Sequence, residues 1–256
     1  MQDYKYLSIK TTPPEVRLTL DRPPLNVLNM EMMEELERAL GEAADAGGAR
    51  VLVMDAAGKA FCAGVDVNDH MGDSAGPMLK IFHKVIRELW HYRLPTVAVV
   101  HGAALGGGCE LALSCDVVIA GTEATLGQPE IAVGVFPPPA AVLFPRLCGL
   151  AAAKELLMTG RIIDAGEAER LGLISKVAGK EALGDEVQVI VKFLSKKSLP
   201  VLALTRKAIL STLDLPLDEA LARAESIYFE ELAKVEDSEE GLTAFLEKRK
   251  PVWKDR

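Results

Sequence analysis

Residues 101–112 read HGAALGGGCELA and follow directly on TVAVV at residues 96–100, an apolar run of strand length. The glycines at 106–108 therefore stand between a predicted strand and a predicted helix. Glycine lets a ligand come close to the backbone at such a turn, where the amides at the helix start carry partial positive charge. These amides suit a phosphate or a developing oxyanion, although the same glycines also fit a tight turn that binds nothing. The spacing is neither GxGxxG nor that of a P-loop.

A second glycine-containing loop comes earlier in the chain. Residues 58–66, GKAFCAGVD, follow the apolar run VLVM at residues 51–54, which is also a predicted strand. Loops at the same ends of neighbouring strands could supply one backbone amide each and so form an oxyanion hole with two donors. Asp66, at the end of this loop, either caps the loop or contacts the ligand.

Two glutamates lie beside these loops. Glu110 falls just inside the predicted helix, among residues of buried character, and Glu130 ends the sequence GQPE at residues 127–130. A surface glutamate needs no explanation, but a buried and unpaired one is costly unless it has a function or a partner. Two carboxylates at one ligand suit general acid–base catalysis, because repulsion and burial can keep one of them protonated near neutral pH. The four histidines form no Ser-His-Asp or Cys-His arrangement and are interpreted as structural.

Strands alternate with helices as far as about residue 120, which predicts an α/β fold. The predicted strands cover residues 16–20, 51–54, 96–100 and 117–120, and the predicted helices run through residues 33–40 and 79–89. Asn29 is the predicted N-cap of the first helix. From about residue 150 the chain is mainly helical, with one short strand at 174–177. Breaks are expected near Pro200, Pro216 and Asp237.

Composition restricts the class of protein. The 256 residues carry a formal net charge of 29 − 37 = −8, and 49% are apolar. This excludes a disordered chain and disfavours general nucleic-acid binding, which needs a basic surface. No apolar run reaches the roughly 18–20 residues of a membrane span, and the N-terminal sequence MQDYKY resembles no targeting peptide, so we expect a cytoplasmic protein. The four cysteines lack zinc-ligand spacing and are expected to be reduced, buried thiols, with no metal site.

Three segments resemble, in order, the motifs of the crotonase (enoyl-CoA hydratase/isomerase) superfamily. They are KAFCAGVD at 59–66, HGAALGGGCELA at 101–112 and GQPE at 127–130, with further matches at 21–23, 26–28 and 241–249. The resemblance implies a ββα superhelical core, expected at residues 1–195. It also implies a helical C-terminal region at residues 196–256 that builds a homotrimer or a dimer of trimers and covers the CoA site. The implied substrate is an acyl-CoA thioester, with no cofactor other than the CoA of the substrate itself.

The resemblance also assigns roles to individual residues. The oxyanion-hole amides would be those of Val65 and Gly107. Glu110 would activate the water that attacks the β-carbon, and Glu130 would deliver a proton to the α-carbon. Further substrate contacts are implied at Pro24, Leu25, Asn26, Ala63, Gly64, Asp66, Val67, Gly106, Pro129, Phe136, Phe245 and Lys248. The last two would come from a neighbouring subunit, although both also fit an ordinary amphipathic helix.

The sequence departs from the family after the third motif. Common hydratases have a glycine-rich segment there, whereas this chain reads VFPPPAAVLFPR at residues 135–146. Prolines fix φ and remove amide donors, so the acyl end of the pocket is expected to be stiffer and more apolar. The FPPP run is similar to that of hydratases acting on cyclic dienoyl-CoA thioesters such as cyclohexa-1,5-diene-1-carbonyl-CoA.

The predicted function is therefore a hydro-lyase reaction, the addition of water across the conjugated double bond of an enoyl-CoA. A cyclic dienoyl group is one acyl group that this prediction includes. One alternative is a double-bond isomerase, which commonly needs a carboxylate only near the position of Glu130. Another is a non-catalytic member that binds CoA or RNA. The presence of both glutamates favours the hydratase, and the acidic net charge disfavours RNA binding.

Overall fold

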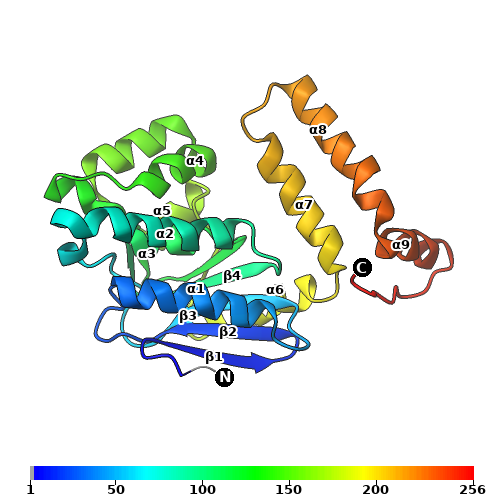
Figure 1. The fold of residues 1–256 in the computed structure, drawn as a ribbon, viewed down its shortest axis with the longest axis horizontal. Helices are drawn as coiled ribbons and strands as arrows, with labels where there is room; N and C mark the ends of the chain where they lie inside the picture. Colours follow the sequence, from blue (N-terminus) through cyan, green and yellow to red (C-terminus); the bar gives the residue numbers. More distant parts are fainter. Residues whose placement is uncertain (1–2) are drawn as a thin grey trace.

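The computed structural model describes residues 3–256, which form two β-sheets surrounded by helices (Figure 1). The larger sheet has the strand order β1-β2-β3-β4-β6-β9. Its strands are β1 (Leu7–Thr12), β2 (Glu15–Leu20), β3 (Val51–Ala56), β4 (Thr96–Val100), β6 (Val117–Gly121) and β9 (Lys176–Ala178). Only β1 and β2 pair antiparallel, and every later pair is parallel. The smaller sheet contains β5 (Ala103–Leu105), β7 (Thr125–Gly127) and β8 (Ile162–Asp164).

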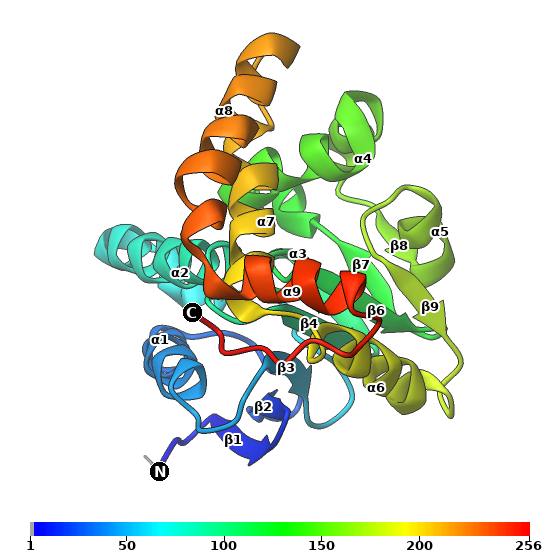
Figure 2. The same ribbon diagram turned by 90° about the vertical axis from the view of Figure 1, so that its right-hand side faces the viewer.

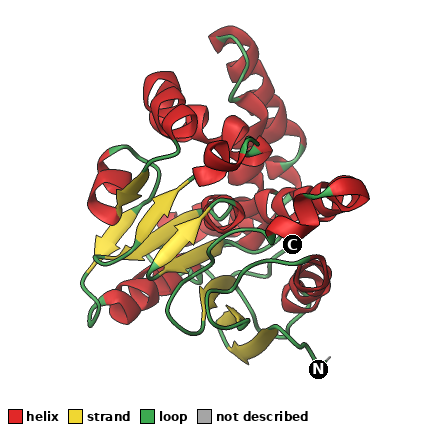
Figure 3. Cartoon of the chain, turned by 90° about the vertical axis from the view of Figure 1, so that its left-hand side faces the viewer, coloured by secondary structure: helices red, strands yellow, loops and turns green. Residues whose placement is uncertain are grey.

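Helices cover the larger sheet on both faces, as the red and yellow elements of Figure 3 show. The helices of the core are α1 (Met30–Ala44), α2 (Ala75–Trp90), α3 (Gly107–Leu113), α4 (Pro138–Thr159), α5 (Ala165–Arg170) and α6 (Leu183–Leu194). Short 3₁₀ turns η1 (Val67–His70), η2 (Gly72–Ser74) and η3 (Pro129–Val133) lie between them. Helices α1 and α2 pack against each other, and α6 packs on the opposite face (Figures 1 and 2).

The central strands β3, β4 and β6 are mostly apolar because both of their faces are buried. Leu52 and Met54 of β3 face the main core beneath α1 and α2, whereas Val51 and Val53 face α6. The α/β fold predicted from the alternation of strands and helices is confirmed. The predicted cap is also confirmed, since the Asn29 side-chain oxygen accepts the Met32 N–H at 3.0 Å.

Some predicted boundaries are wrong. Strand β9 begins at Lys176 rather than at residue 174. The helix break expected near Pro200 is confirmed, because α6 ends at Leu194 and α7 (Leu199–Thr212) begins with Pro200 in its first turn, where proline is tolerated. Helix α4 starts at Pro138, within the proline run at residues 137–139. The strands β1, β5, β7 and β8 were not predicted.

The C-terminal helices α7, α8 (Leu217–Glu230) and α9 (Glu236–Leu246) stand to one side of the core in Figure 1. Helices α7 and α8 pack against each other, and the turn η4 (Leu232–Lys234) connects α8 to α9. Arg206 of α7 fastens this region to the core, because its guanidinium donates to the Asp116 carboxylate and to the Leu94 carbonyl. The last residues of the chain also contact the core, where the Asp255 carboxylate accepts from the Arg50 guanidinium with an N–O distance of 2.5 Å.

The glycine-containing loop at residues 58–66, called the first glycine loop because it comes earlier in the chain, fits closely against the turn at residues 106–108. Cys62 donates its N–H to Ala103 at 3.0 Å, and its carbonyl oxygen accepts the Leu105 N–H at 2.9 Å. A Cβ atom at Gly108 would overlap this carbonyl oxygen. Gly108 is therefore required by the close approach of two backbone segments.

This contact predicts the effect of one methyl group on stability. Gly108→Ala should lower the free energy of unfolding by about 1–3 kcal/mol, because the backbone of the loop must shift. Gly41→Ala, in an exposed part of α1 where no atom lies within 4 Å of the new Cβ, should raise it by about 0.5–1 kcal/mol. Urea unfolding measures both, and equal stability of the two variants would contradict the close fit.

Candidate active site

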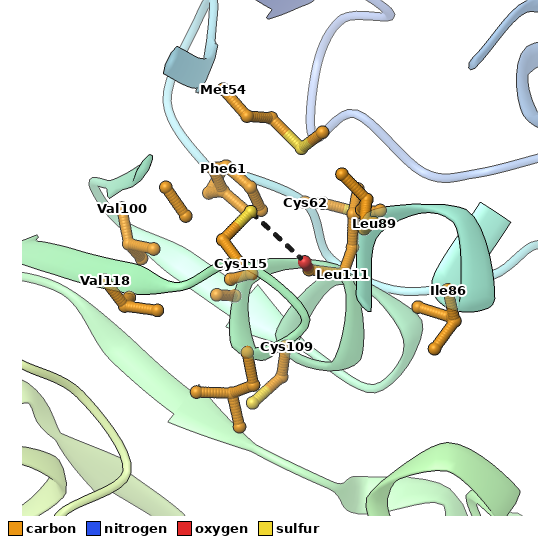
Figure 4. Close-up of a cluster of buried hydrophobic side chains, with 14 of the residues drawn as sticks. Met54, Phe61, Cys62, Ile86, Leu89, Val100, Cys109, Leu111, Cys115 and Val118 are labelled. Atoms are coloured by element: carbon orange, nitrogen blue, oxygen red, sulfur yellow. Dashed lines mark hydrogen bonds between the residues drawn. The ribbon is translucent and has the colours of Figure 1, made fainter. Parts of the chain in front are cut away.

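Helix α3 is buried along its whole length and determines where the site lies. Figure 4 shows Cys109, Leu111 and Cys115 within a cluster of buried side chains that also includes Met54 and Phe61. The Cys115 thiol lies 4.0 Å from the Leu111 carbonyl oxygen. This packing fixes the first turn of α3, so its amide and its glutamate point in set directions.

In the described part of the chain, two backbone N–H groups without an acceptor lie near the start of α3, one from Val65 of the preceding loop and one from Gly107 of the helix itself. Val65 is held by a bridge to Leu28, in which Leu28 donates to Gly64 and Asp66 donates to Leu28, both at 2.8 Å. The Val65 side chain lies against Gly107, because a Cβ added there would meet Val65 Cγ2 at 2.6 Å. Across residues 3–256, neither the Val65 N–H nor the Gly107 N–H donates to a protein acceptor. The structure thus brings together the two donors that the sequence suggested for an oxyanion hole.

Glu110 is almost fully buried, with 3% of its surface exposed. Its Oε1 accepts the N–H of Ala140 at 2.7 Å, at the beginning of α4. Burial raises the pKa of Glu110 from its ordinary value of 4.5 to about 8, the Ala140 N–H opposes this rise, and the nearby Glu130 carboxylate adds to it. The group therefore exchanges a proton near neutral pH.

Glu130 lies on the other side of the same turn. A Cβ at Gly106 would overlap Glu130 Oε1, so glycine at this position makes room for the carboxylate. Gly106 has a φ of +50°, and its carbonyl accepts the Glu110 N–H at 3.0 Å. Burial raises the pKa of Glu130, while backbone hydrogen bonding and the charge of His70 oppose the rise. Residues 106–110 thus place both carboxyl groups beside the helix start.

Gln128 and Ala140 complete the surroundings of the two glutamates, and the sequence did not assign them a role. Gln128 is buried, and with its amide nitrogen turned toward Glu130 it donates to both carboxylate oxygens at 3.2 and 3.3 Å. Pro138 and Pro139 carry no N–H, so Ala140 supplies the first free amide of α4. The two prolines that precede Ala140 can be read from the sequence, whereas the contact of Gln128 with Glu130 depends on the fold.

The residues proposed for the CoA side fall into two groups. Leu25 and Val67 are exposed, at 41% and 63%, beside the first glycine loop, which is joined to residue 25 by the Ala63 N–H. Asn26 is buried and acts within the fold, since its side-chain nitrogen donates to the carbonyls of Ala57 and Ala60 at 2.8 Å each. Pro24 precedes Leu25, and Gly64 follows Ala63 with a φ of +118°.

Asp66 is the N-cap of η1, with its carboxylate accepting the Asn68 N–H at 3.1 Å. This is the capping role that the sequence left open beside ligand contact. Pro129 begins η3 next to Glu130, and Phe136 is 68% exposed before α4. Phe245 of α9 is 81% exposed, and Lys248 follows it beyond the end of this helix. In Figure 1, α9 lies far from α3 within one chain.

Two absences hold for the part of the chain from residue 3 onward. No three His, Cys, Asp or Glu side chains gather there as a metal site, and none of its helices is long and apolar enough to cross a membrane. Three cysteines, Cys62, Cys109 and Cys115, are buried, and Cys148 is half-buried.

The buried Glu110 predicts a pH dependence of stability. Between pH 4.5 and about 8, Glu110 stays protonated in the folded protein but loses its proton in the unfolded chain. The folded state then binds more protons, so the free energy of unfolding falls as pH rises, by at most about 1.4 kcal/mol per pH unit from this group. Glu110→Gln removes the effect. Urea unfolding across this window should show the variant gaining stability relative to the wild type as pH rises, and a constant difference would contradict the assignment.

Comparisons with known proteins show the family of this chain. The family model described as enoyl-CoA hydratase/isomerase matches residues 16–256. The chain is 40% identical to a probable enoyl-CoA hydratase of Rhizobium meliloti over 99% of both chains. It is 36% identical to the cyclohexa-1,5-dienecarbonyl-CoA hydratase of Thauera aromatica over 94% of this chain and 93% of that one. The crystal structure of the Bacillus anthracis enoyl-CoA hydratase superposes with a TM-score of 0.90 at 30% identity, covering 98% of this chain and 100% of that one. The resemblance and the fold inferred from the sequence are confirmed, and the chain belongs to the enoyl-CoA hydratase/isomerase family, the crotonases.

Proposed function

We propose that this chain, a hydro-lyase of the enoyl-CoA hydratase type, adds water across the conjugated double bond of an enoyl-CoA thioester. The observation that carries the proposal is that four groups lie around one helix turn, residues 106–110. They are the N–H groups of Val65 and Gly107 and the carboxyl groups of Glu110 and Glu130. In the reaction the oxygen of water bonds to the β-carbon and a proton is added to the α-carbon, so the product differs from the substrate by one water.

The amides of Val65 and Gly107 would hold the thioester oxygen. Attack at the β-carbon moves electrons onto this oxygen, which becomes an enolate, and preorganised N–H donors stabilise the charge as it develops. Loss of one such donor typically costs about 10²–10³ in rate. Because α3 is buried along its length, its first turn cannot reorient, and the direction of the Gly107 N–H is fixed.

The two glutamates would handle the protons. Glu110 takes the proton of the attacking water, and Glu130 gives a proton to the α-carbon. In the free protein, burial favours the proton on Glu110. The roles require it on Glu130 once the substrate is bound, and the Ala140 N–H supports this redistribution because it stabilises ionised Glu110. A pair that shares one proton supplies both an acid and a base.

The acyl group is proposed to be a cyclic dienoyl group. Residues 137–139 form the stiff, apolar start of α4 next to Glu110, and the Thauera aromatica relative is named for cyclohexa-1,5-dienecarbonyl-CoA. CoA would lie along the loops at residues 24–26 and 63–67. Phe245 and Lys248 would reach it from a neighbouring subunit, in a homotrimer or a dimer of trimers, with residues 196–256 as the assembling region and residues 1–195 as the core.

The two-carboxylate mechanism predicts the effect of removing each acid. Glu110→Gln and Glu130→Gln should each lower kcat for hydration by at least about 10², because an amide neither takes nor gives the proton. Circular dichroism should remain that of the wild type. Glu123→Gln, an exposed glutamate between β6 and β7, is the matched control and should keep full activity. Full activity in either of the first two variants would exclude the mechanism.

The acyl group is tested by offering two thioesters and following mass. We expect cyclohexa-1,5-diene-1-carbonyl-CoA to gain one water and crotonyl-CoA to react far more slowly. Hydration of crotonyl-CoA alone would retain the hydratase and overturn the cyclic substrate. A shifted double bond without a gain in mass would replace hydration by isomerisation.

The assembly is tested through the exposed aromatic pair of α8. The rings of Tyr228 and Phe229 meet edge to face, with their centroids 5.5 Å apart. In the single chain these residues are 57% and 69% exposed. Light scattering should give three or six times the 27.6 kDa of the chain. Phe229→Asp should reduce this mass, whereas Glu219→Gln, exposed on the same helix, should not. A monomeric wild type would contradict the proposed assembly.

A further inference from the structure

A cavity of about 420 Å³ lies between α2, the first turns of α4 and the end of α7. Its lining includes His83, Ile86, Trp90, Pro139 and Leu143. Most of these side chains are apolar, and the polar or charged side chains of the lining are His83 and Arg87 of α2, Arg146 of α4 and Asp214 beyond α7.

Two residues that line the cavity are next in sequence to residues that contact the turn at 106–110. Pro139 lines it, and the next residue, Ala140, donates its N–H to Glu110. His83 lines it from α2, and the preceding residue, Phe82, lies 3.2 Å from the position of a Cβ at Gly107. A cavity whose walls lead through Ala140 to Glu110 and through Phe82 to Gly107 is suited to the part of an acyl group that extends beyond the double bond.

We infer that this cavity holds the distal part of the acyl group and that His83 strengthens the binding of cyclic acyl groups whose ring carries a neutral hydrogen-bonding oxygen, a hydroxyl or a carbonyl, relative to the unsubstituted ring. This inference rests on the proposed function, since it takes the ligand to be an acyl-CoA. It adds a specificity-determining residue that contacts neither the thioester nor the attacking water.

His83 lacks a partner of its own. Its Nε2 is shielded from solvent and has no hydrogen-bond partner in residues 3–256. Within these residues, the Ser198 hydroxyl is the only other buried side-chain polar group without a partner. Buried polar groups without partners are rare, and a ligand is one of the ways to satisfy them. A half-turn about the Cβ–Cγ bond exchanges ring nitrogens with carbons in the same space, so a nitrogen can face the cavity without movement of α2.

The arginines that line the cavity beside His83 are either paired with a carboxylate or exposed to water. Arg146 of α4 is already paired with Asp214 beyond the end of α7, at 2.6 Å. Burial lowers the pKa of His83, and the charge of Arg87, which lies one helical turn away at an exposed position, lowers it further. A neutral imidazole has one donor and one acceptor nitrogen, so it can bond either a hydroxyl or a carbonyl.

The test uses two saturated thioesters that cannot be hydrated, cyclohexanecarbonyl-CoA and 4-hydroxycyclohexanecarbonyl-CoA. Titration calorimetry gives the Kd of each for the full-length wild type and its variants. The wild type should bind the hydroxylated thioester at least 10-fold more tightly than the hydrocarbon. His83→Phe should abolish this preference, and His83→Asn, which keeps a hydrogen-bonding side chain, should retain part of it. His91→Phe, exposed at the end of the same helix, is the matched control and should leave the preference unchanged.

The outcomes separate this inference from the proposed function. If the wild type binds both thioesters without preference, or if His83→Phe keeps the preference, the selection by His83 is wrong while acyl-CoA binding stands. If the wild type binds neither thioester, the acyl-CoA ligand itself is wrong, and the inference falls with it.

Discussion

The burial of helix α3 is the constraint on which the site depends. All seven residues from Gly107 to Leu113 are buried, and they fill the space between the larger sheet, α2 and the first glycine loop. A helix held on every side has one possible direction for its free N-terminal amides. The same packing leaves no room for side chains at residues 106–108, so glycine is required for Glu130 and for the loop at Cys62 to approach. Catalytic geometry and core packing are therefore one arrangement.

A buried carboxyl group is the cost of that arrangement. Glu110 is removed from water and next to a second acid, and both conditions favour its neutral form. The start of α4 offsets part of this cost, because the Ala140 N–H and the positive end of the helix favour the ionised form. The two opposing effects leave the pKa close to neutrality instead of at either extreme. A group that must both hold and release a proton during one reaction needs this balance.

Local signals in the sequence were sufficient for much of the fold and for the centre of the site. The Asn29 cap, the apolar central strands and the buried character around Glu110 are all visible in short windows. The three-residue strands β5, β7 and β8 were missed because they are too short to show a period, and β1 because it is an edge strand with only Leu7 buried.

The contacts that the sequence could not give are those between distant segments. The approach of Gln128 to Glu130 and the cavity at His83 arise from the packing of separate elements. His83 has no partner and no motif, so its interpretation as structural was the only one that a single sequence supported. Phe245 and Lys248 lie outside the site of their own chain, so any role in binding would depend on a second subunit.

The proline run would link the proposed acyl selectivity to the proposed proton transfer. Pro138 and Pro139 both line the cavity at His83, and by lacking N–H groups they make Ala140 the first donor of α4, which binds Glu110. A substitution that widened the cavity at these positions would also restore an amide near the carboxylate or loosen the helix start that fixes Ala140. The shape of the acyl space and the ionisation of Glu110 are thus set by one helical turn. A change in substrate at this turn must keep the Ala140–Glu110 hydrogen bond, whereas changes at α2, on the opposite wall, are free of that condition.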